Sequence, residues 1–274
     1  MREMTLCDLQ KFGLKILKEV HVFCKKNNIR YSLAYGTLIG AIRHKGFIPW
    51  DEDIDVVMPR PDFERFCKTY KSKMFKIIEP SDPKCWIGFA RVCDTEKTYA
   101  ETFSRWCEYD TGVWIDIFPI DGASDCFADF QRDVRRSHFL WMKQLYCRNA
   151  RHAFSKRSGI VFNIALFIKK ILRLNGKNLE KYNNMLVQNA KKIKYGETKH
   201  FSQLVCLDVG DKDYQKKEDF SYVVEVPFED GFFDAMNGYD SVLKKVYGDY
   251  MKLPAPEKRI PKLTEVKFFW RDLS

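Results

Sequence analysis

The sequence has 274 residues (32.5 kDa), enough for one large domain or for a domain with an added helical segment. Hydrophobic residues make up 45% and charged residues 31%, with only 14 Gly and 10 Pro, which excludes collagen-like, disordered and low-complexity classes. The longest apolar run, residues 160–168, is much shorter than the roughly 20 residues that a transmembrane helix needs. Nine unpatterned cysteines and the absence of a signal-peptide core favour a cytoplasmic location.

The net charge of +10 is concentrated in one segment. Residues 132–200 contain 17 Lys and Arg against three acids, whereas the rest of the chain contains 30 Lys and Arg against 34 acids. A segment this basic predicts an anionic partner. Two interpretations are open for residues 148–174: a core-packing helix with a basic rim, or a surface that contacts the anionic inner leaflet of a membrane. The apolar face comprises Ile160, Ile164, Phe167, Ile168, Ile171, Leu172 and Leu174, and the basic rim comprises Arg148, Arg151, Lys156, Arg157, Lys169, Lys170 and Arg173.

The hydrophobic periodicity predicts an α/β (α+β) fold, a mixed sheet flanked by helices. In chain order, the predicted elements are a helix over 6–26, a strand over 29–35, a helix over 38–43 with Thr37 as its N-cap, a strand over 53–58, a helix over 59–70, strands over 75–78, 86–92 and 113–118, helices within 127–194, strands over 203–207 and 222–226, and a helix over 239–247. This order predicts a catalytic core over 1–126, a basic helical insertion over 127–200 and a closing α/β segment over 201–274.

Residues 35–58, YGTLIGAIRHKGFIPWDEDIDVVM, contain the pattern with the most chemical information. Asp53 and Asp55 lie two apart in a predicted strand, so both carboxylates project from one face. Two adjacent acids repel each other unless a cation lies between them, and oxygen ligands of this kind suit Mg²⁺ or Mn²⁺. A solvated strand edge with incidental acids is the simpler alternative.

A predicted turn at Gly36 and Thr37 lies between a strand and a helix, a geometry that presents backbone N–H groups to an anion. An ordinary turn is the alternative. Further along the chain, Asp116 is flanked by apolar residues in a predicted buried strand. Because a lone buried carboxylate is unfavourable without a cation or hydrogen bonds, we expect Asp116 to belong to the same site.

Basic and aromatic residues nearby are candidates for holding a nucleotide. Arg43, His44 and Lys45 lie between the turn and the acids, and we expect at least one of them to contact phosphate. Arg91 lies in an otherwise apolar strand, so it pairs either with a structural Asp or with a donor diphosphate. Trp50 could stack on a base or on a cation, although core packing is the commoner role for such a residue.

The stretch GTLIGAIRH-x-GFIPWDEDIDV closely resembles the signature of the LicD family of cholinephosphotransferases, which is related to the fukutin-type ribitol-phosphate transferases within the nucleotidyltransferase superfamily. Residues 115–122 (IDIFPIDG) and 247–254 (YGDYMKLP) resemble it too, so the resemblance covers most of the chain. Glu52 departs from the usual Asp, and residues 259–263 lack the histidines that commonly follow in the family, which leaves the role of this tail open.

The resemblance implies a nucleotidyltransferase-like core with a phosphate cradle at Gly36 and Thr37. It implies that Asp53, Asp55 and Asp116 bind Mg²⁺ or Mn²⁺, and we expect Asp116 to orient or deprotonate the acceptor hydroxyl. The expected reaction transfers phosphocholine from CDP-choline to a sugar hydroxyl of a cell-surface glycan, such as lipopolysaccharide, teichoic acid or capsule, and releases CMP.

Alternatives remain open at this point. Another CDP-alcohol could be the donor, carrying ribitol, glycerol or ethanolamine, or the chain could transfer a nucleotidyl group and release pyrophosphate. A sequence pI near 9.0 makes nucleic-acid binding a third hypothesis. No nucleic-acid-binding motif is present, however, and we expect no nucleic-acid partner. The acceptor glycan could be lipid-linked, which would suit a cytoplasmic enzyme in peripheral contact with the inner face of the membrane.

Overall fold

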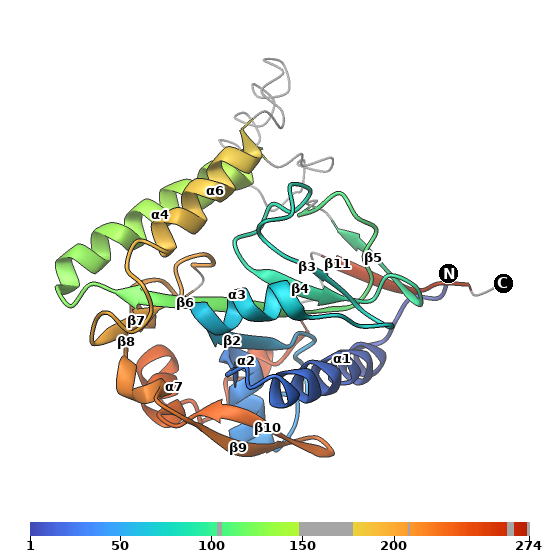
Figure 1. Ribbon diagram of the computed structural model, residues 1–274. Helices are drawn as coiled ribbons and strands as arrows, with labels where there is room; N and C mark the ends of the chain where they lie inside the picture. The colour runs from blue at the N-terminus through green and yellow to red at the C-terminus, as the bar shows by residue number, and fades with distance from the viewer. Residues whose placement is uncertain (103–105, 148–177, 208, 262–265, 273–274) are drawn as a thin grey trace.

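The computed structural model describes residues 1–102, 106–147, 178–207, 209–261 and 266–272 (Figure 1). Helices surround a mixed sheet, which confirms the predicted α/β class. The helices are α1 (Leu6–Lys26), α2 (Tyr35–Ile39), α3 (Arg60–Thr69), α4 (Phe127–Cys147), α6 (Leu179–Ala190) and α7 (Tyr239–Tyr247). A π-helical turn, Gly40–His44, directly follows α2, and 3₁₀ turns span Gly210–Asp213, Lys217–Phe220 and Pro256–Lys258.

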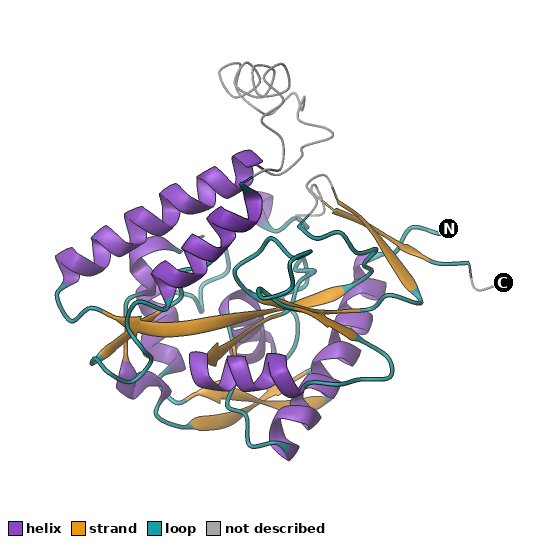
Figure 2. Cartoon of the chain, turned by 45° about the horizontal axis from the view of Figure 1, so that its top comes forward, coloured by secondary structure: helices purple, strands orange, loops and turns teal. Residues whose placement is uncertain are grey.

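The largest sheet in the described residues has seven strands, and β1, β2, β6, β4 and β3 pair side by side in that order. Figure 2 shows the strands among the surrounding helices. β2 and β6 are parallel, whereas β1, β4 and β7 pair antiparallel with their neighbours. The strands are β1 (Ser32–Leu33), β2 (Asp55–Pro59), β3 (Lys76–Ile78), β4 (Ala90–Cys93), β5 (Thr98–Thr102), β6 (Trp114–Ala123), β7 (His200–Ser202), β8 (Gln215–Lys216), β9 (Val223–Phe228), β10 (Gly231–Met236) and β11 (Val266–Trp270).

The first helix forms as its sequence predicts. Thr5 and Asp8 make a reciprocal capping box, in which the Asp8 backbone N–H donates to Thr5 Oγ1 at 3.2 Å and the Thr5 N–H donates to Asp8 Oδ2 at 3.0 Å. Two lysines in the last turn complement the helix dipole. The apolar side of α1, including Ile16 and Val20, is fully buried against the central sheet.

The two faces of the sheet contribute to two separate hydrophobic cores. Val56 and Met58 of β2 and Ile115 and Ile117 of β6 join the core that contains α1 and α3. The alternate residues of the same strands, such as Val57, join the core that contains residues of α4, α6 and α7. Because side chains alternate along a strand, Asp55 and Asp116 lie on this second face, opposite to α1 and α3.

Segments from the second half of the chain complete the sheet and its surroundings. α4 and α6 run side by side (Figure 1), and β7 extends the sheet by pairing with the end of β6. β9 and β10 form a hairpin that lies against β1. β11 pairs with β5, and the Met4 N–H donates to the Phe268 carbonyl at 2.8 Å, which brings the two ends of the chain together.

Several predicted boundaries were wrong. α2 begins at Tyr35 after Ala34, so Thr37 lies inside the helix and is not its N-cap. β2 begins at Asp55, which leaves Asp53 before the strand. The strand predicted over 203–207 lies at His200–Ser202, where it completes the ladder with β6, and residues 203–207 form no strand. In each case pairing with a distant strand or helix decided the boundary, which local periodicity does not report.

No helix in the described part of the chain is long and apolar enough to cross a membrane. The predicted apolar face and basic rim of residues 148–174 lie outside the described residues, so both interpretations of that segment stay predictions. The division into segments 1–126, 127–200 and 201–274 also stays a prediction.

Candidate active site

The predicted catalytic acids of two strands meet at the centre of the sheet. Asp55 and Asp116 are directly paired residues of the parallel strands β2 and β6, and the Asp116 N–H donates to the Ile54 carbonyl at 2.9 Å. Both side chains project from the face opposite to α1 and α3 and stay partly accessible. The structure therefore joins two acids that lie 61 residues apart in the sequence.

Asp116 is held by Arg91, its partner on the antiparallel strand β4. Arg91 Nε donates to Asp116 Oδ1 at 2.6 Å and Arg91 Nη2 donates to Oδ2 at 3.2 Å, a two-point pairing. The Arg91 guanidinium carbon also lies 4.3 Å from the ring centres of both Trp106 and Trp114. Of the two alternatives for Arg91, the structure contains the ion pair with an Asp, and that Asp is itself a predicted site residue.

Asp53 is the third predicted acid. It is exposed and lies just before β2, two residues from Asp55. Within the described residues, no three His, Cys, Asp or Glu side chains are gathered as a ready metal site. The donor set nevertheless suits a hard divalent cation, because Asp55 and Asp116 present carboxylate oxygens from adjacent positions on one face.

The predicted phosphate cradle is built differently from a simple turn. Gly36 lies in the first turn of α2, and a Cβ at this position would displace the Asp51 carboxylate, whose Oδ2 lies against the glycine. Thr37 is buried, and its Oγ1 accepts a hydrogen bond from the Asp55 N–H at 2.9 Å. Gly36 and Thr37 thus fix the start of β2. Asp51 was missed as a site residue because it reads as one of several acids in a polar run.

The residues between the cradle and the acids have mostly structural partners. Arg43 Nη1 donates to the Tyr250 carbonyl at 2.6 Å, which ties the first motif to the C-terminal one, and burial lowers the pKa of Arg43. His44 accepts a hydrogen bond from Arg43 Nε at 2.9 Å, and burial, together with Arg43, lowers its pKa. Lys45 is exposed and donates to the Ile42 carbonyl at 3.1 Å. Trp50 packs at the edge of the core, its ring centre 6.4 Å from that of His44.

Tyr35 is a further residue at the site that the sequence did not single out. Its φ of 47° lies in the left-handed region, which is unusual for a bulky residue and is often found near functional sites. Its ring contacts Phe118 edge to face at 5.8 Å, on the face of β6 that carries Asp116. Burial and then the neighbouring acids, Asp213 and Asp55 among them, raise the pKa of the Tyr35 phenol.

Comparison with known proteins agrees with this geometry. Residues 28–156 match a family described as LicD/FKTN/FKRP, nucleotidyltransferase domain, and this range contains all ten predicted site residues. The chain is 32% identical to the lipopolysaccharide cholinephosphotransferase LicD of Haemophilus influenzae over 274 residues, which cover 95% of this chain and 97% of that protein.

An uncharacterized protein of Rickettsia typhi is 36% identical over 135 residues, which cover 48% of this chain and 36% of that protein. An uncharacterized protein of Rickettsia prowazekii is 44% identical over 48 residues, 18% of each chain. The similarity to the Haemophilus influenzae protein spans nearly the full length of both chains. The residues matched by the family model include the strands that carry Asp55 and Asp116. The chain therefore belongs to the LicD family.

Proposed function

We propose that the protein transfers phosphocholine from CDP-choline to a sugar hydroxyl of a cell-surface glycan and releases CMP. The observation that carries the proposal is the pairing of Asp55 with Asp116 on one sheet face, in a chain similar to a lipopolysaccharide cholinephosphotransferase over nearly its full length. Lipopolysaccharide is accordingly the first acceptor to test, with teichoic acid and capsule as the other glycans in the same class.

In the proposed reaction, the acceptor oxygen forms a bond to the phosphorus that carries choline. The bond between that phosphorus and the bridging oxygen breaks, and CMP leaves with the electron pair. In this proposal Asp116 orients the acceptor hydroxyl and accepts its proton. Arg91 donates to both oxygens of Asp116 and so fixes the orientation of the carboxylate.

We further propose that Asp53, Asp55 and Asp116 would hold Mg²⁺ or Mn²⁺. Such an ion would neutralise the negative charge that develops on the diphosphate. Asp55 is already oriented through its backbone by Thr37 and by the pairing with β6. Asp53 is exposed and two residues from Asp55, so the chain around it could adjust when ligands bind.

For the nucleotide, Lys45 is the basic candidate whose side chain is exposed to solvent. Arg43 donates to the Tyr250 carbonyl and to His44, so these two residues would not contact the nucleotide. They would instead fix the turn that carries Lys45. Trp50, only partly buried, offers a ring edge beside His44. At the predicted cradle the Asp51 carboxylate lies beside Gly36, so a phosphate bound on that side would have to displace it.

The direct test is an assay with labelled donors. CDP-choline labelled in the choline should yield labelled glycan and unlabelled CMP, and purified lipopolysaccharide is the first acceptor. Transfer from CDP-ribitol, CDP-glycerol or CDP-ethanolamine instead would change the alcohol but keep the reaction. Release of pyrophosphate from CTP, without transfer from any CDP-alcohol, would replace the proposal by nucleotidyl transfer.

A second experiment tests the metal. EDTA should abolish transfer, and an excess of Mg²⁺ or Mn²⁺ over the chelator should restore it. Turnover that persists in excess EDTA would remove the metal from the proposed function and leave Asp116 as the principal group.

A further inference from the structure

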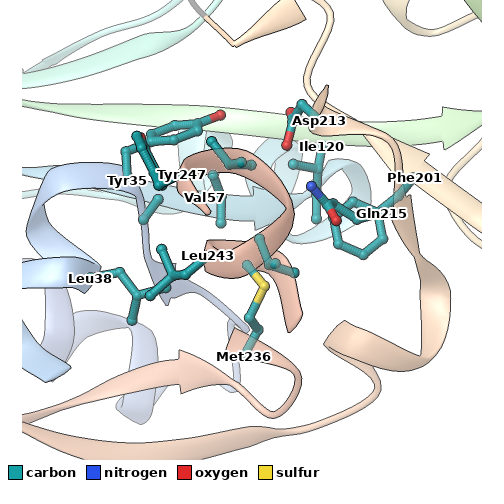
Figure 3. Close-up of a pocket in the computed structure, with 13 residues that line it drawn as sticks. Tyr35, Leu38, Val57, Ile120, Phe201, Asp213, Gln215, Met236, Leu243 and Tyr247 are labelled. Atoms are coloured by element: carbon teal, nitrogen blue, oxygen red, sulfur yellow. The ribbon is translucent and has the colours of Figure 1, made fainter. Parts of the chain in front are cut away.

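A pocket lies on the same sheet face as the catalytic acids. Two of its lining residues are Val57, two positions after Asp55 in β2, and Ile120, four positions after Asp116 in β6. Even spacing along a strand keeps a side chain on the same face, so the pocket opens beside the acids on this face. α7 and the strand residues Phe201 and Gln215 complete its walls (Figure 3).

The walls combine one carboxylate with aromatic and aliphatic groups. Asp213 and Gln215 lie at one end of the pocket, and Tyr35 and Tyr247 lie on another side (Figure 3). The remainder is almost entirely apolar, with the aliphatic side chains of α7 and of Leu38 and Met236. An acid among aromatic faces is the combination that proteins use to recognise a quaternary ammonium group.

Asp213 is buried with no cation in direct contact. Only 8% of the residue is exposed, and its Oδ2 accepts a hydrogen bond from the Gln203 N–H at 2.8 Å. Lys245 attracts its charge from a longer distance and donates its own hydrogen bond to the Tyr214 carbonyl. Burial raises the pKa of Asp213 to about 7. A buried carboxylate of this kind is unfavourable alone, and a bound cation would offset its desolvation.

The pocket has one exposed wall. The cavity itself has a volume of only about 20 Å³, room for about one water molecule, and the open space around it, solvent at the mouth included, is about 410 Å³. Tyr247, at 44% exposure, is the one lining residue classed as exposed and stands at the mouth. Widening the pocket for a ligand would require the Tyr247 ring, the most exposed part of the wall, to move.

We propose that this pocket is the subsite for the cationic end of the donor's alcohol, a quaternary ammonium group that Asp213 recognises by charge and Tyr247 by its ring. The inference rests on the proposed function and names the property of the donor that the protein selects. A neutral polyol such as ribitol or glycerol would leave Asp213 without a cation among apolar walls, so the pocket disfavours those donors.

The experiment compares two donors of the same shape and different charge. CDP-choline and CDP-3,3-dimethylbutanol differ only in that a quaternary carbon replaces the nitrogen, and their dissociation constants are measured by calorimetry with Mg²⁺ and no acceptor. The wild type should bind CDP-choline about tenfold more tightly than the neutral donor. Asp213→Asn, which keeps the shape and the hydrogen bond from Gln203, should reduce this ratio to below about threefold.

Two further variants separate the subsite from general damage. Asp211→Asn is the matched control, because Asp211 lies in the same 3₁₀ turn but pairs with Gln131 outside the pocket, so it should keep the wild-type ratio. Tyr247→Leu keeps an apolar wall and removes the ring, so the ratio should fall partway. Equal binding of the two donors by the wild type, or an unchanged ratio in Asp213→Asn, would overturn the subsite.

The labelled-donor assay tells this failure from a failure of the proposed function. If the wild type transfers phosphocholine but does not discriminate by charge, the subsite alone is wrong. If the wild type neither binds CDP-choline nor transfers from any CDP-alcohol, the proposed function fails and the subsite fails with it.

Discussion

Strand β6 carries two Asp–Arg pairs of the same chemistry on its opposite faces. On one face, Asp121 pairs with Arg60 of α3 at 2.6 and 2.8 Å, and their side chains are only 1% and 8% exposed. On the other face, Asp116 pairs with Arg91 of β4, and their side chains are 16% and 13% exposed. The five-residue offset between Asp116 and Asp121 places them on opposite sides of the strand.

The two pairs differ in how accessible their carboxylates are. Asp121 lies with α3 on a closed side of the sheet, where burial raises its pKa despite the facing Arg60. Asp116 is directly paired with Asp55 in the ladder and keeps part of its carboxylate accessible. The same pair of residue types is thus enclosed on one face of the strand, and on the other face it stays partly accessible beside Asp55, where we propose that it serves the reaction.

The largest expected effect is the loss of activity when Asp53 or Asp55, the acids near the Asp116–Arg91 pair, is replaced. Asp53→Asn or Asp55→Asn should reduce transfer by about 10³-fold or more, because each removes a carboxylate from the proposed metal site. The melting temperature should stay close to that of the wild type, since repulsion among neighbouring acids is relieved. Initial rates and thermal denaturation measure both, and full activity in either variant would contradict the site assignment.

The buried pair of Asp121 and Arg60 should contribute more to the stability of the fold than the Asp116–Arg91 pair does. Asp121→Asn leaves Arg60 buried without its counter-charge, which should lower the free energy of unfolding by about 3–5 kcal/mol and the melting temperature by about 10 °C. The kcat of the folded protein should change less than twofold. Asp116→Asn is the comparison, because its partner Arg91 is less buried and keeps its two tryptophan contacts, and an equal loss of stability in both variants would break the distinction.

A smaller effect is expected from Arg91→Lys. Lysine cannot hold both oxygens of Asp116 or lie flat between Trp106 and Trp114, so kcat should fall by about 10- to 100-fold while the KM for CDP-choline is nearly unchanged. A rise in KM with an unchanged kcat would favour the other interpretation, in which Arg91 binds the donor diphosphate. Arg60→Lys is the control, and it should affect the melting temperature without this change in kcat.

The smallest expected effect concerns Asp213, a buried acid with neither kind of pair. Because its pKa of about 7 in the folded protein lies above the ordinary 3.8, the folded state binds an extra proton, and stability is lost as pH rises from 4 through 7. Asp213→Asn should therefore raise the melting temperature by about 2–4 °C at pH 8 and leave it nearly unchanged at pH 4. The same increase at both pH values would show that Asp213 does not carry this charge.

Local sequence determined much of this protein by itself. Apolar spacing predicted helices over 6–26 and 239–247, with the bounds that α1 and α7 have. The motif at 35–58 was also enough to identify the family to which the chain belongs, and it predicted Asp55 as a site residue. These features depend on neighbours within a few residues along the chain.

Tertiary structure alone decided which distant groups meet. The strands β5 and β11 were not predicted, because each is stabilised by a partner more than 160 residues away and not by its own alternation. The pairing of Arg91 with Asp116 follows from the register of β4 on β6, which determines which of several candidate partners receives the guanidinium. Asp213 faces Tyr35 because a chain segment returns over the sheet about 180 residues after the first motif. The burial of Asp213 and its neighbours depends on how this distant segment packs on the sheet, and a local sequence pattern does not report it.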